Sequence, residues 1–329
     1  MREDSQQEPL FYVPQNKYKE EIQIYHDEVY DDKNRPFGHQ FLIVPTRSKF
    51  FFNNVLMIER KKYKAENLTI NWKKLRQNYS KNRNIVAKRW LEILYNAAHN
   101  SSLKCIKENK EPVITKFPLG IKIGSIFIST IDAMSDDFWL HVEKSGDRTR
   151  KKYETLLRWG IKGCLHFFFN PDYTNYSQVL VRNFYTDGKV FGNVKLDRER
   201  IFTRLENSLR NYVKINKDIE ITPVKKSQIK TPEVNFEELT DIILGATYYL
   251  CGKGKREKWK DKIVEPLKNI YCKRERGRNL KTSGHYRNFT VGYCNVDDNN
   301  ELNFHNWELV LDDKAIQRDS QKILDLKYF

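Results

Sequence analysis

Four aspartates stand at the ends of hydrophobic runs or within an apolar helix, although they lie far apart along the chain. They are Asp27, Asp132, Asp187 and Asp241. The first three follow runs typical of β-strands, whereas Asp241 lies inside a long apolar run. A carboxylate with many buried neighbours loses hydration, and a cation or hydrogen bonds must offset that cost. If several of these aspartates converge in the folded chain, they form a divalent-metal site.

Each aspartate also has a purely structural interpretation. Asp187 precedes a glycine, and Asp132 could begin the turn that follows it, because aspartate favours turns. Asp241 could face solvent on an amphipathic helix, and Asp27 could pair with a lysine or arginine. Glu28 directly follows Asp27, and adjacent strand residues face opposite sides. Both can therefore enter one site only if the strand has already ended at Asp27.

The apolar pattern predicts an α/β domain with a mixed sheet flanked by helices. Its first part is an antiparallel meander of strands over 22–27, 39–44 and 50–58. The predicted elements that follow are a helix over 84–98, a strand over 121–131, a helix over 148–161 that stops before Gly163, strands over 164–169 and 178–185, a helix over 201–213, a short strand over 219–221 and a helix over 236–250. Residues 289–293 and 308–311 have the pattern of two further strands, a hairpin added to the core.

Composition indicates a folded, basic protein. The 329 residues are 39% hydrophobic, which is enough for a substantial core. The formal charge of +16 favours a polyanionic partner such as nucleic acid, although charge alone does not exclude an anionic membrane. No stretch has the length of a membrane span, so no membrane partner is expected. The five cysteines lack C-x-x-C spacing and the N-terminus lacks a signal-peptide pattern, so we expect a reduced cytoplasmic protein.

The positive charge is concentrated towards the C-terminus. Residues 253–288 contain 13 Lys and Arg against four Asp and Glu, a net charge of +9, together with three aromatic residues that could stack on bases. A solvated surface helix is the alternative interpretation. The candidate nucleic-acid-binding residues in this segment are Lys253, Lys255, Arg256, Lys258, Arg274, Arg276 and Arg278.

Four short phrases carry a family resemblance through their number and order. They are Tyr25-His26-Asp27-Glu28, Thr69-Ile70-Asn71-Trp72, Ile131-Asp132 and Leu239-Thr240-Asp241-Ile242-Ile243-Leu244-Gly245-Ala246. Together they resemble the bacterial domain-of-unknown-function family 3800, which has a ribonuclease H-like fold. The resemblance covers about residues 20–252. It implies a five-stranded mixed sheet in that domain and leaves the basic extension over 253–329 unexplained. Residues 1–19 are polar and are expected to form a flexible arm.

The resemblance also implies a metal site. Asp27 would bridge two Mg²⁺ or Mn²⁺ ions, with Asp132 and Asp241 as flanking ligands and Asp187 as an alternative or additional one. Where the family phrase carries an acid, this chain has Thr69, and Glu66 lies three residues earlier. The acid has therefore been lost or replaced, which leaves catalytic competence open.

Three hypotheses follow for function. The first is a metal-dependent nuclease acting on RNA or DNA. The second is a nucleic-acid-binding protein on a catalytically degenerate nuclease fold, and the third is an adaptor with a protein partner in a bacterial defence or mobile-element system. Trp72 and Lys73 could contact substrate, with a core tryptophan and a solvated lysine as the alternative.

Overall fold

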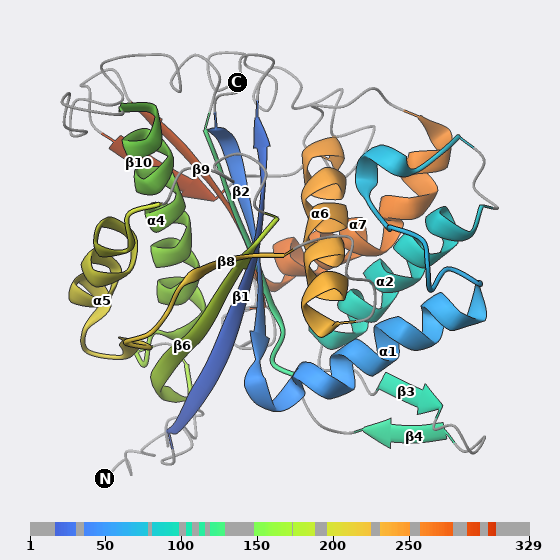
Figure 1. The fold of residues 1–329 in the computed structure, drawn as a ribbon, viewed down its shortest axis with the longest axis horizontal. Coiled ribbons are helices and arrows are strands. Elements are labelled where there is room, and N and C mark those ends of the chain that lie inside the picture. The colour runs from blue at the N-terminus through green and yellow to red at the C-terminus, as the bar shows by residue number, and fades with distance from the viewer. Residues whose placement is uncertain are drawn as a thin grey trace, which may run out of the picture.

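A mixed eight-stranded sheet forms the centre of the molecule, and helices lie on both sides of it (Figure 1). The computed structural model describes residues 17–30, 36–77, 81–98, 103–106, 112–115, 119–128, 148–172, 174–187, 196–224, 231–250, 257–278, 288–296 and 302–306. The strands are β1 (Tyr18–Tyr30), β2 (Pro36–Pro45), β5 (Lys122–Ile128), β6 (Tyr176–Thr186), β7 (Val213–Ile215), β8 (Ile221–Pro223), β9 (Phe289–Val296) and β10 (Leu302–Asn306), and β3 (Leu103–Ile106) and β4 (Pro112–Thr115) form a separate hairpin. The helices are α1 (Lys49–Lys62), α2 (Asn82–Ala98), α4 (Arg148–Phe169), α5 (Arg204–Leu209), α6 (Pro232–Leu250) and α7 (Lys258–Arg278), with the short segments η1 (Thr46–Ser48), η2 (Trp72–Lys74) and η3 (Glu199–Thr203).

The sheet order is β10-β9-β5-β2-β1-β6-β7, and β8 also pairs with β6. β2 is antiparallel to both of its neighbours, β1 and β5. β6 is parallel to β1, β7 and β8. The strands β1, β5 and β6 therefore all end at the same edge of the sheet. The predicted α/β class with a mixed sheet is confirmed, but the sheet exceeds the expected five strands because β7, β8 and the β9–β10 hairpin extend it on both sides.

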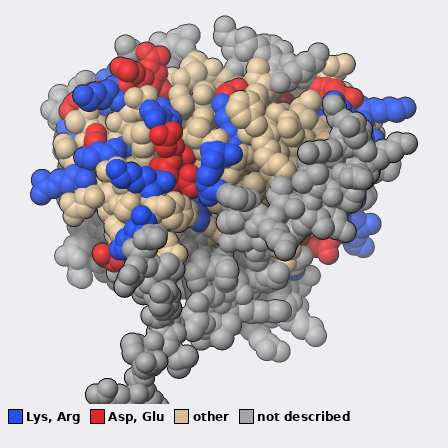
Figure 2. Space-filling view, turned by 90° about the horizontal axis from the view of Figure 1, so that it is seen from below, with Lys and Arg blue, Asp and Glu red and all other residues tan. Residues whose placement is uncertain are grey.

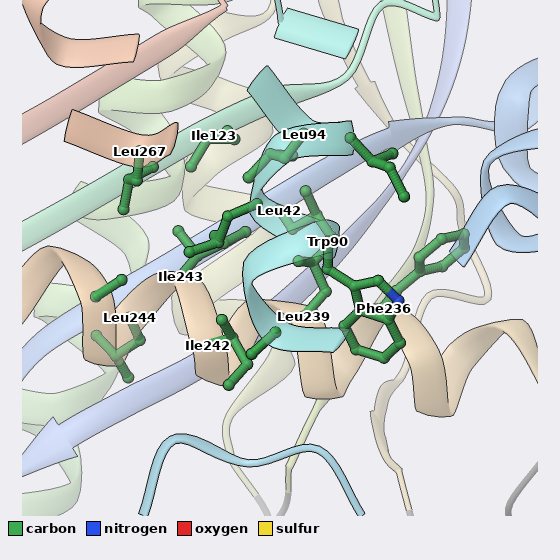
Figure 3. Packing of buried hydrophobic residues seen from close by; sticks show 14 of the residues in the cluster. Leu42, Trp90, Leu94, Ile123, Phe236, Leu239, Ile242, Ile243, Leu244 and Leu267 are labelled. Carbon is green, nitrogen blue, oxygen red and sulfur yellow. The ribbon is translucent and has the colours of Figure 1, made fainter. Parts of the chain in front are cut away.

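Side chains alternate between two cores, one on each face of the sheet. Tyr25 and Leu42 point towards α1, α2, α6 and α7, while Ile24 and Ile43 point towards α4 and α5. Figure 3 shows the first core, where α6 packs its apolar side chains around Trp90 of α2. The indole of Trp90 is fully buried, and its Nε1 donates a hydrogen bond to the Leu56 carbonyl. No helix in the described ranges combines the length and apolar character needed to cross a membrane.

Two predicted strands are helices. Residues 50–58 belong to α1, because Phe52, Val55 and Leu56 are buried at helical spacing while Phe50 is 73% exposed. Residues 164–169 are the last turns of α4, which continues through Gly163 to Phe169. The apolar periodicity of the helix runs on past that glycine, and burial of the continuous apolar face outweighs one glycine's helix penalty.

Other boundaries also differ from the prediction. The helix predicted over 201–213 ends at Leu209, and Val213 begins β7. The strand predicted over 289–293 is β9, which pairs with both β5 and β10. The partner strand predicted over 308–311 lies outside the described residues, as do most of the predicted arm and Asp132.

Two glycines of α4 provide a test of its packing. A Cβ at Gly160 would lie 2.6 Å from Phe41 and 2.7 Å from Ile126, whereas a Cβ at Gly163 meets nothing within 4 Å. We expect Gly160→Ala to lower the free energy of unfolding by about 1–3 kcal/mol through overpacking. Gly163→Ala should raise it by about 0.5–1 kcal/mol, because alanine is the better helix former. Urea denaturation of both variants checks this, and a destabilising Gly163→Ala would contradict a helix that continues through this position.

Candidate metal site

Three carboxylates meet where β1 extends past the end of its parallel neighbour. The last residue pair between β1 and β6 is His26 with Thr186. Asp27 and Glu28 lie immediately past that pair on β1, and Asp187 directly follows Thr186. One carboxylate oxygen from each of Asp27, Glu28 and Asp187 lies within 4.8 Å of the other two. This acidic cluster could hold a metal ion.

Glu28 is a member that the sequence did not predict. β1 continues to Tyr30, so the expected condition for Asp27 and Glu28 to share a site, a strand ending at Asp27, is not met. Their carboxylate oxygens nevertheless lie within 4.8 Å of each other, just past His26 and Thr186, the last pair between β1 and β6 in the described residues. The Oε2 atom of Glu28 lies 3.5 Å from His26 Nδ1.

Asp27 is in a strongly unfavourable environment for an ionised acid. Its side chain is buried, and its Oδ1 accepts a hydrogen bond of 2.9 Å from the backbone N–H of Glu28. Burial raises the pKa of Asp27 well above its usual value, and the negative charges of Asp241, Asp187, Glu237 and Glu28 raise it further. Within the described ranges no lysine or arginine forms an ion pair with Asp27. A divalent cation would reverse this electrostatic cost.

The helix α6 supplies two more carboxylates. Glu237 and Asp241 are four residues apart, so they lie on one face of the helix. Glu237 is fully buried, and both acids are close enough to raise the pKa of Asp27. Sequence reasoning missed Glu237, although an acid one turn before Asp241, and so on the same helix face, was a usable signal.

Asp241 is partly exposed and accepts two hydrogen bonds. Its Oδ1 accepts from Asn71 Nδ2 at 2.8 Å, and its Oδ2 accepts from the backbone N–H of Trp72 at 2.6 Å. Asn71 also caps η2 by accepting from the backbone N–H of Lys73. The aspartate therefore orients the segment before α2, in addition to adding negative charge beside Asp27.

A buried ion pair anchors the same segment to α6. Arg60 of α1 pairs with Glu238, and both side chains are at most 2% exposed. Arg60 Nη1 also donates to the carbonyls of Ala65 and Leu68, while Glu238 Oε2 accepts from the backbone N–H of Ile70. Because each partner has further hydrogen bonds, this pair is satisfied in the core.

Two neutral histidines lie directly behind the acidic cluster. His26 Nε2 lies 2.8 Å from His39 Nδ1, and His26 Nδ1 lies 3.1 Å from Thr186 Oγ1. Burial lowers the pKa of His26 to about 3 and lowers the pKa of His39 well below its usual value, with a contribution from His26. The contact with Thr186 ties the end of β6 to β1 one residue before Asp187 and Asp27.

The other predicted residues are placed less fully. Asp132 lies outside the described residues, but β5 ends at Ile128 on the same sheet edge as β1. Lys258, the first residue of α7, is exposed. Arg274, Arg276 and Arg278 fall within α7 with side chains outside the described part, and Lys253, Lys255 and Arg256 lie outside it altogether. Thr69, which stands where the resemblance predicts an acid, accepts a hydrogen bond at its carbonyl from Arg83.

Comparison of the chain with protein-family models, curated proteins and solved structures found no match. The resemblance to family 3800 therefore stays a prediction. Functional inference rests on that resemblance and on the geometry of the acidic cluster.

The raised pKa of Asp27 predicts a pH-dependent stability. Because the folded protein holds the Asp27 proton more tightly than the unfolded chain, this residue contributes most stability below its unfolded pKa of about 3.9. That contribution falls as the pH rises towards the raised pKa, with a slope of up to about 1.4 kcal/mol per pH unit. We expect Asp27→Asn to remove this slope when unfolding is measured in EDTA between pH 4 and 8. Parallel curves for wild type and variant would contradict the pKa shift.

Proposed function

We propose that this protein is a divalent-metal-dependent nuclease that hydrolyses phosphodiester bonds in RNA or DNA. The observation that supports it most is the meeting of Asp27, Glu28 and Asp187 at one sheet edge, faced by Glu237 and Asp241 of α6. These acids come from three separate parts of the chain. Close packing of like charges is costly, and a site that binds cations is a sufficient reason to retain it.

The donor set fits Mg²⁺ or Mn²⁺. All candidate ligand atoms are carboxylate oxygens, which suit hard divalent cations. Asp27, Glu28 and Asp187 would hold the metal, and Asp241, oriented by Asn71 and Trp72, would add charge beside it. When bound, such ions activate a water nucleophile and stabilise the leaving oxygen of a phosphodiester. The chain's own acids bind and orient the ions.

The strand arrangement supports a ribonuclease H-like fold for this domain. The first acid stands on the central strand β1, the second follows its parallel neighbour β6, and the third lies on the late helix α6. The resemblance over residues 20–252 predicts the first and third of these positions, whereas its second ligand is Asp132 and Asp187 is an alternative or additional one. Asp132, which follows β5 in the chain, remains a proposed ligand.

One observation favours the alternative of a nucleic-acid-binding protein without catalysis. Both oxygens of Asp241 already accept hydrogen bonds, and Thr69 stands where the resemblance predicts an acid. In this alternative Asp241 serves mainly to hold the segment around Trp72. The alternative predicts binding without cleavage.

A cleavage assay separates these two functions. Labelled single-stranded, duplex and hybrid RNA and DNA are incubated with Mg²⁺ or Mn²⁺ and with wild type, Asp27→Asn or Asp187→Asn. We expect each variant to lose at least about 100-fold in rate, an effect comparable to removing one charge-stabilising group in other enzymes. The control is Asp218→Asn, an exposed acid on the other side of β6, which should leave the rate unchanged. Cleavage that survives in Asp27→Asn would refute the proposal.

A further inference from the structure

The connection between α1 and α2 carries a second concentration of positive charge, in addition to the C-terminal segment 253–288. Residues 61–83 contain eight lysines and arginines and one acid, Glu66, a net charge of +7. This density is higher than in residues 253–288, where +9 is spread over a longer stretch. The charge lies on the segment that Asp241 holds. The position of these cations relative to the acidic cluster therefore bears on how a nucleic acid could bind.

The backbone of this segment is fixed at several points. Glu238 accepts the N–H of Ile70, and Asp241 accepts the N–H of Trp72. Further along, Asn84 of α2 accepts the N–H of Arg76 and donates to the Arg76 carbonyl. The Trp72 ring lies against Gly245 of α6, where an added Cβ would be 2.1 Å from the ring. The chain between Trp72 and Arg76 is thereby held at both ends.

Three basic side chains project from this fixed backbone. Lys73, Lys74 and Arg76 are all exposed. None of the three forms an ion pair with any residue in the described ranges. Lys73 directly follows Trp72, whose N–H is 2.6 Å from the Asp241 carboxylate. The backbone that carries these cations is thus held at Asp241, and no ion pair in the described ranges neutralises them.

Basic residues elsewhere in the described part of the chain are often paired. Arg47 contacts Glu20 at 3.0 Å, and Arg182 contacts Glu21 at 2.6 Å. Figure 2 shows a face on which Lys and Arg side chains lie among Asp and Glu side chains. Such mixed surfaces have little net field for a polyanion, whereas an unpaired set of fixed cations has a strong one.

The first turn of α7 lies next to Trp72. Lys260 Nζ lies 5.8 Å from the Trp72 ring centroid and 5.2 Å from that of Trp259, and it pairs with Glu257 at 2.6 Å. The beginning of the C-terminal basic segment is therefore next to residues 72–76. The two positively charged parts of the chain meet beside α6.

We propose that Lys73, Lys74 and Arg76 form a phosphate-binding strip that holds the backbone of a nucleic-acid strand beside the acidic cluster. This inference rests on the proposed function for its substrate class. A fixed backbone lowers the conformational cost of binding, and lysine and arginine are the side chains that contact phosphates. The strip contacts phosphates, so it positions a strand without selecting its sequence.

The test compares two triple charge reversals in the full chain. One is Lys73→Glu/Lys74→Glu/Arg76→Glu. The matched control is Lys162→Glu/Lys217→Glu/Arg210→Glu, which changes the same residue types and net charge at exposed positions on the other side of the sheet. Binding of fluorescently labelled 20-nucleotide RNA and DNA strands is followed by anisotropy in EDTA, which prevents cleavage, between 50 and 200 mM salt.

We expect the strip variant to bind at least about tenfold more weakly than the control variant. Its plot of log affinity against log salt should also lose about two units of slope, because each phosphate contact to a single strand accounts for about 0.7. Equal weakening in the two variants, or no binding by wild type, would overturn the strip. Unfolding curves test whether both variants fold. If the strip variant does not fold, Lys73→Gln/Lys74→Gln/Arg76→Gln takes its place.

The outcome separates this inference from the proposed function. Strip-dependent binding by a wild-type protein that never cleaves would support the strip and refute the nuclease. Metal-dependent cleavage by wild type, with the strip variant binding as tightly as the control, would support the nuclease and refute the strip. Asp27→Asn should retain strip-dependent binding in EDTA in either case, since the acid does not contribute to phosphate contacts.

Discussion

The parallel pairing of β1 with a shorter β6 is the constraint on which the candidate site depends. Parallel strands end at one edge of a sheet, and here β1 extends beyond Thr186. Asp27 and Glu28 therefore lie just past the last pair of the two strands in the described residues, where Asp187 comes close to both. The contact between His26 and Thr186 closes the pairing at this point.

The helix α6 has two roles, packing against the sheet and placing acids near Asp27. Its apolar side chains pack into the core of the sheet, and Glu238 satisfies the buried Arg60. The turn that carries Glu237 and Asp241 instead places negative charge next to Asp27. Asp241 belongs to both parts, because it adds to this charge and also holds Asn71 and Trp72. A substitution of Asp241 is expected to affect both the acidic cluster and the orientation of the proposed phosphate-binding strip.

Acidic and basic side chains lie on neighbouring segments without forming ion pairs between Asp241 and Lys73, Lys74 or Arg76 in the described residues. The acids gather behind the sheet edge, and the exposed cations of residues 73–76 follow directly after Trp72. Hydrogen bonds through the backbone, not ion pairs between side chains, connect the two groups. In the proposed function this arrangement leaves the acids available to cations and the lysines available to phosphates.

The sequence by itself determined the α/β class and most strand and helix positions, because local apolar periodicity is visible in one dimension. It also singled out Asp27 and Asp241 as candidate site residues, because isolated acids beside apolar runs are visible in the same way. It did not predict that residues 50–58 and 164–169 are helical, since short apolar runs rich in phenylalanine fit either element until their partners are known. Only the tertiary structure decided that Glu28 belongs to the acidic cluster and that Glu237 lies close to Asp27. The unequal ends of β1 and β6 and the face of α6 towards β1 depend on contacts between segments more than 150 residues apart.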